Sequence, residues 1–279
     1  MSVFASGTAR VTVPATSANL GPGFDSLGLA LDLRDEMVGE VTGSGLQVEV
    51  SGVCADDVPR DESHLVVRAM RAAFDAMDVS PPGLRLSCDN AIPHGRGLGS
   101  SAAAIVGGAA LARALVADGE ALLDDDSLFR LAAGIEGHPD NVAPALLGGF
   151  VISGKEGANF YALPSTVDSR ISVVVFVPPD PVSTEVARGL LPEQVSHADA
   201  AADAGRTALL VAALAQRPEH LFLATRDYLH QDFRRAAMPD SLELVDRLRL
   251  DGVAATVSGA GPTVLAFTSA RHAPADLLE

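Results

Sequence analysis

The stretch PHGRGLGSSAA at residues 93–103 decides the fold of this chain. Its glycines at alternate positions, Gly95, Gly97 and Gly99, let the backbone bend tightly and approach a ligand without interference from a Cβ atom. Ser100 and Ser101 follow where a helix is predicted to begin, and the free N–H groups at a helix start bind anions. The stretch does not match the Walker loop, the dinucleotide-binding pattern or the nucleophile elbow. It predicts a phosphate-binding loop or, alternatively, only a tight strand–helix turn capped by serine.

The composition limits the classes of partner. The 279 residues are 48% hydrophobic and carry a formal net charge of -16, which argues against nucleic acid and against anionic membrane surfaces. Phosphates would then need local backbone N–H groups, a metal ion and a few placed basic side chains. The first ten residues are too polar for a signal peptide, and no apolar run reaches the roughly 18 residues of a membrane span. Cys54 and Cys88 have no metal-ligand spacing, so we predict two buried, reduced thiols in a cytoplasmic protein.

Two further segments combine glycine with small polar residues. The segment PATSANLGPGFD at residues 14–25 follows a strand predicted over Ala9–Val13, which we expect to break at Pro14. By itself it is typical of a surface Ω-like loop, although Asp25 would suit a substrate cation and Asn19 a polar group. The segment VSGAGPT at residues 257–263 lies between two predicted strands and is equally typical of an ordinary hairpin.

Hydrophobic periodicity predicts mixed helices and strands along the rest of the chain. Strands are predicted at 46–50, 84–87, 150–153, 171–177 (strongly buried), 253–257 and 263–267, and helices at 63–77, 101–117, 127–136, 141–147, 198–216, 219–228 and 241–250. Residues 154–169 are polar, contain glycine and lack periodicity, so we predict a domain junction there.

Taken together, in this order and at these separations, segments 14–25, 93–103 and 257–263 resemble the three signature motifs of the GHMP kinases. The resemblance covers nearly the whole chain. It implies an α+β two-domain fold: residues 1–155 like the second domain of ribosomal protein S5, with a left-handed βαβ unit, and residues 156–279 ferredoxin-like. It also implies that the third motif closes the active-site floor near the first. The family fold adds a strand beyond the position of Glu279, so the C-terminal sheet is one strand short or the sequence is trimmed.

Within that superfamily the chain resembles the homoserine kinases. The resemblance rests on ANLGPGFD at 18–25, which lacks the lysine of mevalonate-type members, EGHPDNV at 136–142, STEVAR at 183–188 and HQDFR at 230–234. It implies ATP-dependent phosphorylation of L-homoserine to O-phospho-L-homoserine in threonine biosynthesis, by an enzyme that is usually a homodimer.

An amino-acid substrate suits the side chains that these segments supply. Arg188 and Arg234 would clamp its α-carboxylate, because guanidinium binds carboxylates bidentately. Asp25 would hold the α-ammonium group. The expected substrate-binding residues are Asn19, Asp25, His138, Asn141, Arg188, Arg234 and Gly259.

The resemblance also implies the ATP and Mg²⁺ sites. Glu136 and the Ser101 hydroxyl, with Ser100 as a substitute, would hold an Mg²⁺ ion that bridges the β- and γ-phosphates. The family commonly has an asparagine before its Leu-Val run, where this chain offers Ser63 or His64. The expected ATP-binding residues are Pro93, His94, Gly95, Arg96, Gly97, Leu98, Gly99, Ser100, Ser101, Ala102, Ala103 and Ser63.

The catalytic base of mevalonate kinase-like members is missing here, a departure that homoserine kinases share. Mevalonate kinase-like members have an aspartate where this chain has Asn141, which cannot accept a proton. We therefore predict catalysis by positioning and charge stabilisation, with Asn141, Glu136 and Ser101 as the catalytic residues. Asp140 is the rival candidate for a base, and we do not favour it.

Two other functions stay open at this point. Another GHMP kinase, acting on a polyol, isoprenoid or sugar, would lack the arginine clamp, which is present here. A catalytically silent ATP-binding protein on the same fold would have lost Glu136 or the Ser100–Ser101 pair, and neither is lost.

Overall fold

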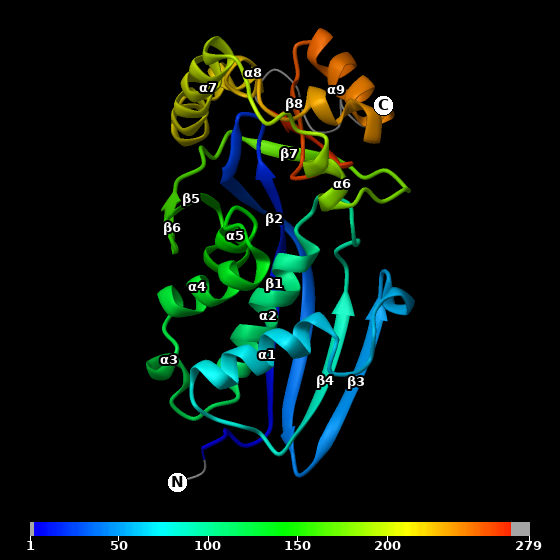
Figure 1. Cartoon of the computed structure of the whole chain (residues 1–279), viewed down its shortest axis with the longest axis vertical. Helices are drawn as coiled ribbons and strands as arrows, with labels where there is room; N and C mark the ends of the chain where they lie inside the picture. The colour runs from blue at the N-terminus through cyan, green and yellow to red at the C-terminus, as the bar shows by residue number, and fades with distance from the viewer. Residues whose placement is uncertain (1–2, 269–279) are drawn as a thin grey trace.

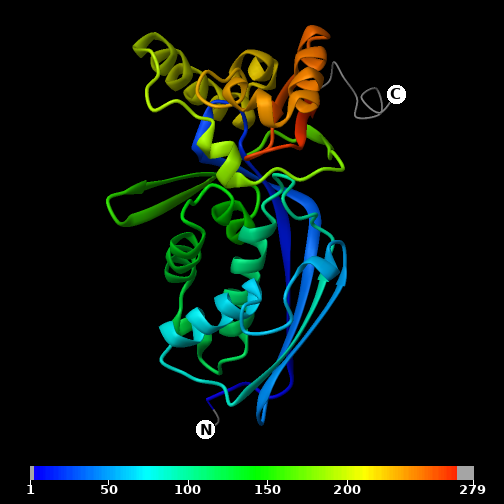
Figure 2. The ribbon, with the colours of Figure 1, turned by 45° about the vertical axis from the view of Figure 1, so that its right-hand side comes forward.

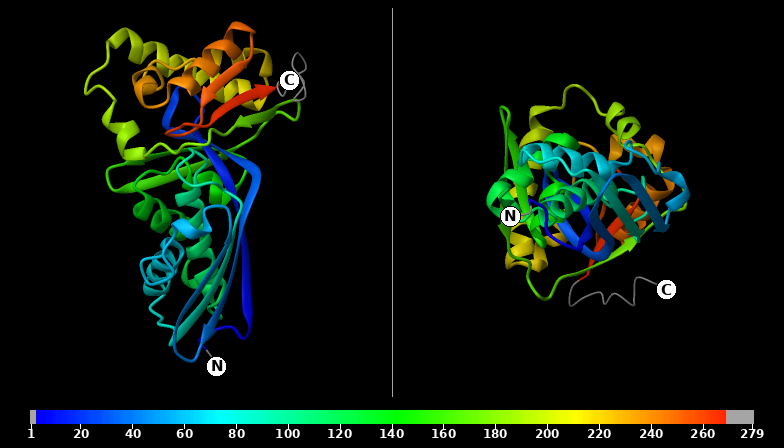
Figure 3. Two further views of the ribbon diagram at one scale, coloured as in Figure 1. Left: turned by 90° about the vertical axis from the view of Figure 1, so that its right-hand side faces the viewer. Right: turned by 90° about the horizontal axis from the view of Figure 1, so that it is seen from below.

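Two β-sheets organise the chain in a computed structural model that describes residues 3–268. The large sheet has the strand order β3-β4-β2-β5-β6, with β1 paired to β2, and the small sheet has the order β7-β9-β8. Helices α1, α2, α4 and α5 gather on one side of the large sheet, and α7, α8 and α9 lie beyond the small sheet (Figures 1 and 3). The chain therefore has the two mixed α+β halves that the sequence predicts.

The larger half begins with three strands and ends with two, and most of its helices lie between them in sequence. They are β1 (Thr8–Asn19), β2 (Gly23–Thr42), β3 (Gly45–Gly52), α1 (Leu65–Ala76), β4 (Gly83–Asn90), α2 (Ser100–Ala114), α3 (Gly119–Leu122), α4 (Asp125–Glu136), α5 (Val142–Leu147), β5 (Phe150–Glu156) and β6 (Asn159–Ser165). The smaller half contains β7 (Ser172–Phe176), α6 (Thr184–Gly189), α7 (His197–Ala215), α8 (Leu221–Ala224), α9 (Pro239–Leu250), β8 (Ala254–Val257) and β9 (Val264–Thr268). Strands β3 and β4 are parallel neighbours with α1 between them in sequence, which makes this segment the βαβ unit of the fold.

Strands β1 and β2 form a long antiparallel hairpin whose tip enters the smaller half (Figures 1 and 2). Leu20 and Leu27 at the tip are buried in one apolar cluster with Leu210, Leu214 and Phe267. Apolar burial of this kind is the main force that holds the two halves together. The interpretation of residues 14–25 as a surface Ω-like loop is therefore wrong.

The predicted break of the first strand at Pro14 is also wrong. β1 continues to Asn19, and the ladder shifts register between Pro14 and Thr16. A proline is tolerated there because β1 pairs only with β2 in the part of the chain that the structure describes, and because bulges accommodate a residue without an N–H group. Strand β2 was not predicted, although the leucines at 27, 29, 31 and 33 alternate with the period of a strand.

The core of the larger half is built around α2. Its small residues let it lie close to α1 and to the sheet, so the prediction of a central, well-buried helix is confirmed. Phe74, Met70 and Leu111 pack there with Leu84 and Leu86 of β4. This packing fixes the start of α2, the end that carries the glycine loop.

Three local predictions differ from the structure. Residues 154–165 belong to the β5–β6 hairpin and not to an aperiodic junction. Phe160 and Ala162, two positions apart, pack against the core, which is the spacing of a strand. The boundary expected after residue 155 lies inside β5, and the division of the chain near this point stays a proposal. β7 is only half buried, and the helix expected over 219–228 is reduced to the short α8 and a 3-10 turn.

Several expectations concern compartment or the end of the chain. Cys88 is buried and Cys54 partly exposed, and both are free thiols. None of the helices between residues 3 and 268 has the length and apolar character needed to cross a bilayer. The expectation about a further C-terminal strand concerns the sequence beyond Glu279, and residues 269–279 before it lie outside the described residues.

We expect stability to depend on the buried carboxyl group of Asp203 in α7. It accepts the backbone N–H of Tyr228 at 3.0 Å, and burial, with the nearby Asp227, raises its pKa to about 6. A raised folded-state pKa means that the folded chain binds this proton more tightly than the unfolded chain does. The stability contributed by this group therefore falls as the pH rises from about 4 to about 6.

The substitution Asp203→Asn should accordingly raise the Tm at pH 8, and the gain should shrink as the pH falls toward 4. Thermal unfolding followed by circular dichroism measures this difference. The exposed Glu193→Gln serves as a charge-matched control and should change stability by less than about 0.5 kcal/mol. A lower Tm for Asp203→Asn at pH 8 would contradict this account.

Candidate active site

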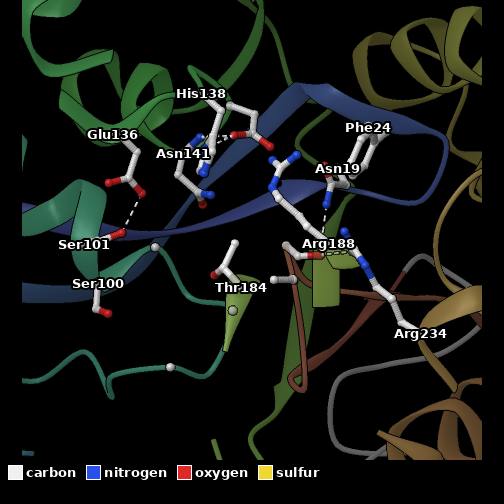
Figure 4. A pocket seen from close by; sticks show the side chains of 16 residues that line it. Asn19, Phe24, Ser100, Ser101, Glu136, His138, Asn141, Thr184, Arg188 and Arg234 are labelled. Carbon is white, nitrogen blue, oxygen red and sulfur yellow. Dashed lines mark hydrogen bonds and ion pairs between the residues drawn. The ribbon is translucent and has the colours of Figure 1, made fainter. Parts of the chain in front are cut away.

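A cavity of about 220 Å³ lies where the two halves meet (Figure 4). The glycine loop, the starts of α2 and α5, the end of α4 and the helix α6 surround it. Its lining residues are Asn19, Phe24, Gly95, Gly97, Gly99, Ser100, Ser101, Glu136, His138, Asp140, Asn141, Thr184, Arg188, Arg234, Gly259 and Ala260.

The glycine loop has the backbone geometry that its sequence predicts. Gly97 and Gly99 have φ angles of 72° and 69°, in the left-handed region that disfavours other residues. A Cβ atom on Gly97 would lie 2.2 Å from the Ser258 carbonyl oxygen, and one on Gly99 would lie 2.0 Å from Oγ1 of Thr16. No side chain caps α2, so the first N–H groups of this helix are available to an anion. The serine-capped turn, the alternative interpretation, is therefore not supported.

Ser101 and Glu136 form an oxygen pair at the start of α2. The Ser101 hydroxyl donates to Oε1 of Glu136 at 2.5 Å (Figure 4). Burial raises the pKa of Glu136, and the hydrogen bond from Ser101 opposes that shift. Among the described residues no cluster of three or more His, Cys, Asp and Glu side chains is placed to hold a metal. A hydroxyl and a carboxylate beside an anion site nevertheless fit Mg²⁺, which binds through few protein oxygens and completes its shell with phosphates and water.

The next polar group comes from the segment between α4 and α5. Nδ1 of His138 lies 3.0 Å from Oδ1 of the buried Asp140, and this hydrogen bond raises the pKa of His138. Asn141 accepts a hydrogen bond from the Thr16 hydroxyl through Oδ1 at 2.8 Å, which leaves its amide NH₂ as a donor. Thr16 belongs to the first motif, and no role was predicted for it. Its partner Asn141 is 125 positions away, so the sequence gives no local sign of this contact.

Arg188 and Arg234 lie at the other end of the cavity, and both are close to Phe24. Their guanidinium carbons lie 5.3 Å and 5.5 Å from the centre of that ring. Two nitrogens of Arg188 bind the carboxylate of Asp25 at 2.5 Å and 3.1 Å, which raises the pKa of Arg188. Asp25 thus contacts Arg188 and does not line the cavity.

Arg234 is almost fully buried, and burial lowers its pKa to about 10. Its Nε donates to the Ala187 carbonyl oxygen at 3.2 Å, and its Nη1 donates to the Gly259 carbonyl oxygen at 3.1 Å. Asn19 donates to the same Gly259 oxygen at 2.9 Å. The Ser258 hydroxyl donates to the Gly97 carbonyl oxygen at 2.6 Å. The third motif therefore forms the floor of the site beside the first, as the sequence predicts.

A second cavity, of about 290 Å³, lies on the other side of the α2 start and shares Ser100 and Ser101 with the first. Its remaining lining is mostly apolar and includes Val58, Pro59 and Val66. Ser63 lines it but donates its hydroxyl to Asp61 at 2.5 Å. His64, also in the lining, is buried, and its Nδ1 atom has no hydrogen-bond partner.

Some predicted residues lie apart from the first cavity. The Arg96 guanidinium is occupied by the carbonyl oxygens of His94, Pro178 and Pro179, and His94 lines the second cavity. Leu98, Ala102 and Ala103 are buried in the core behind the loop, and Pro93 is partly buried outside both linings. Phe24 and Thr184 were missed as lining residues, although both belong to motifs already singled out.

Comparison with known proteins gives consistent matches. Residues 64–149 match the GHMP kinases N terminal domain and residues 208–279 match the GHMP kinases C terminal domain. A homoserine kinase of Streptomyces coelicolor is 57% identical over 267 residues, which are 96% of this chain and 86% of that protein. One from Mycolicibacterium smegmatis is 50% identical over 280 residues, 98% of this chain and 88% of that protein.

Solved structures give the same result. A homoserine kinase from Cytophaga hutchinsonii superposes with a TM-score of 0.82 at 26% identity, over 100% of this chain and 90% of that chain. The mevalonate kinase of L. major, in complex with R-mevalonate, has a TM-score of 0.73 at 15% identity, over 100% of this chain and 92% of that one. The second likeness is one of fold alone.

We expect Gly97→Ala to disrupt the loop. The added methyl group would meet the Ser258 backbone in a disfavoured φ region, so unfolding should become easier by at least about 2 kcal/mol. The control Gly205→Ala lies in the exposed face of α7 with open space around it. It should be neutral or stabilising by up to about 1 kcal/mol. Urea unfolding measures both, and equal effects would contradict the proposed close contact.

Proposed function

Because the chain belongs to the homoserine kinases of the GHMP kinase superfamily, we infer that it transfers the γ-phosphoryl group of ATP to the hydroxyl group of L-homoserine. The enzyme is a phosphotransferase with an alcohol group as acceptor, and its product, O-phospho-L-homoserine, belongs to threonine biosynthesis. The GHMP kinase fold expected from the three motifs is confirmed. One observation supports the acceptor most directly: two arginines and an anion-binding helix start face the same cavity from opposite ends.

We assign the triphosphate to the glycine loop and the start of α2. The N–H groups there and the helix dipole attract negative charge locally, which a chain of net charge -16 requires. The second cavity would take the nucleoside, because it is largely apolar and meets the first at Ser100 and Ser101. Arg96 would act on the loop indirectly, by fixing residues 178–179 against it.

We propose that the Glu136 carboxylate and the Ser101 hydroxyl hold Mg²⁺. The ion would neutralise charge on the β- and γ-phosphates as the phosphoryl group leaves. Burial raises the pKa of Glu136, whose carboxylate accepts a hydrogen bond from the exposed Ser101 hydroxyl. A bound cation would favour the ionised carboxylate and lower that pKa.

For the acceptor, we propose that Arg188 and Arg234 bind the α-carboxylate, with Asn19, His138 and Asn141 orienting the remaining polar groups. Asp25 was expected to hold the ammonium group. Its two hydrogen bonds to Arg188 favour another role, that of fixing the Arg188 guanidinium in the orientation that faces the substrate. The backbone carbonyl of Gly259 would act in the same way on Asn19 and Arg234.

We propose no general base. Asn141 cannot accept a proton, and Asp140 is engaged by the His138 ring and by the Asn141 N–H. In a loose phosphoryl-transfer transition state the hydroxyl needs little activation, so its proton would leave late, to the phosphoryl group. Positioning of the acceptor by the two arginines and Asn141 would then make the main contribution to the rate. The homodimer and the cytoplasmic location expected from the sequence stay predictions.

A coupled ADP-release assay with Mg²⁺, ATP and L-homoserine tests both the function and the metal ligand. Glu136→Gln should lower kcat at least about 100-fold and raise the Mg²⁺ concentration needed for half-maximal rate. The exposed Glu120→Gln is the matched control and should resemble the wild type. Absence of wild-type turnover would refute the function, whereas a normal kcat for Glu136→Gln would refute only the metal assignment.

The nucleoside contact is tested separately. We propose that Nδ1 of His64, rather than the Ser63 hydroxyl, contacts the base or ribose, because Ser63 is already bonded to Asp61. His64→Ala should raise the KM for ATP about tenfold with a smaller effect on the KM for L-homoserine. Ser63→Ala should change either constant less than about threefold. The reverse result would move the contact to Ser63.

A further inference from the structure

His230 lies fully buried between the first motif and Arg234, and no role in the reaction has been assigned to it so far. Its Nε2 atom is 2.7 Å from the Gly21 carbonyl oxygen, and its Nδ1 atom is 3.1 Å from Nη1 of Arg234. A carbonyl oxygen only accepts and a guanidinium only donates. The contacts therefore fix a neutral imidazole with its proton on Nε2 and its lone pair directed at Arg234.

Several hydrogen bonds hold the segment that carries His230. The Asp227 carboxylate accepts the backbone N–H groups of Leu229, His230 and Gln231 at 2.7–3.0 Å. The side-chain oxygen of Gln231 accepts the N–H of Val257 in β8 at 2.5 Å. The backbone next to the imidazole is thus fixed by hydrogen bonds. The ring cannot turn without breaking its own buried hydrogen bonds to Gly21 and Arg234, which are costly to leave unmade.

The neutral form is favoured by the surroundings of the ring. Burial lowers the pKa of His230, and the neighbouring Arg234 adds to that effect, while Asp227 and Asp25 oppose it. Asp227 lies 3.6 Å from Nε2, but its oxygens already accept three backbone N–H groups. The ring of Phe24, which lines the cavity, lies 5.2 Å from the imidazole.

The N–H donors of the Arg234 guanidinium are shared among three partners. Both hydrogens of Nη1 are used, one by His230 and one by the Gly259 carbonyl oxygen, and the hydrogen of Nε is used by the Ala187 carbonyl oxygen. Within residues 3–268, Nη2 has no hydrogen-bond partner, and Arg234 lines the cavity. The Nη2 edge is therefore the part of the group left for a ligand.

We propose that His230 is a positioning residue of the kinase reaction: its Nδ1 lone pair fixes the rotation of the Arg234 guanidinium so that Nη2 faces the carboxylate of the acceptor. The proposal rests on the function inferred above, because it requires an acceptor with a carboxylate. His230 touches neither substrate nor nucleotide. It ties the position of Arg234 to the turn at Gly21, so that the first motif and the arginine move as one unit.

The test compares two substitutions of His230 by steady-state kinetics. His230→Phe keeps a flat ring and removes both polar atoms, so the KM for L-homoserine should rise at least tenfold, with kcat and the KM for ATP changed less than threefold. His230→Gln can again donate to Gly21 and accept from Arg234, and it should recover most of the loss. The exposed His197→Gln serves as the control and should behave as wild type.

A double-mutant cycle with Arg234→Leu supplies the decisive readout. If His230 acts through Arg234, His230→Phe should add less than twofold to the KM of the Arg234→Leu enzyme. Fully additive effects, an unchanged KM in His230→Phe, or equal changes in kcat and in both KM values for the Phe and Gln variants would overturn the proposal. Absence of L-homoserine turnover in wild type and His197→Gln would instead overturn the function on which the proposal rests.

Discussion

The Gly259 carbonyl oxygen is the point on which the arrangement of the site depends. It accepts hydrogen bonds from Asn19 and from Arg234, while the N–H of the same residue donates to the Ala18 carbonyl oxygen at 3.0 Å. The bonds of Gly259 with Asn19 and Ala18 join segments 240 or more residues apart in sequence, and the bond from Arg234 joins residues 25 positions apart. Each would cost about 1–3 kcal/mol if one partner were left unsatisfied. The apolar tip of the β1–β2 hairpin holds the two halves together, and this polar junction fixes how they are aligned.

The same junction explains how an acidic protein handles two anionic ligands. A net charge of -16 repels ATP and a carboxylate alike at long range. Positive potential is supplied locally by the start of α2, with its free N–H groups, and by two arginines whose guanidinium groups lie beside Phe24. Asp25 orders Arg188, and carbonyl oxygens with a neutral imidazole order Arg234. Arg188 is thus pre-oriented by a carboxylate partner and Arg234 by neutral groups alone, and this pre-orientation reduces the entropy lost on binding.

The sequence predicted the glycine-rich motifs better than the surroundings of the site. The glycine loop and the third motif were recognisable because backbone freedom leaves a local pattern of residue types, whereas the roles expected of Ser101 and Glu136 came from the family resemblance and stay proposals. The long strand β2 left a period of two that was overlooked, and the β5–β6 hairpin was hidden by its polar residues. The contacts of Asp25 with Arg188 and of Thr16 with Asn141 join residues 163 and 125 positions apart. Such contacts arise from tertiary packing, and no local pattern of one sequence encodes them.

The central claim is that the cavity selects an amino-acid acceptor through its carboxylate and phosphorylates its hydroxyl group. The most direct measurement compares kcat/KM of the wild-type enzyme for L-homoserine and for 3-aminopropan-1-ol, which keeps the hydroxyl and amino groups but lacks the carboxylate. Loss of two charge-assisted contacts should lower kcat/KM at least about 1000-fold for the second substrate. Values within tenfold of each other would contradict the claim, because the two arginines would then play no part in choosing the substrate.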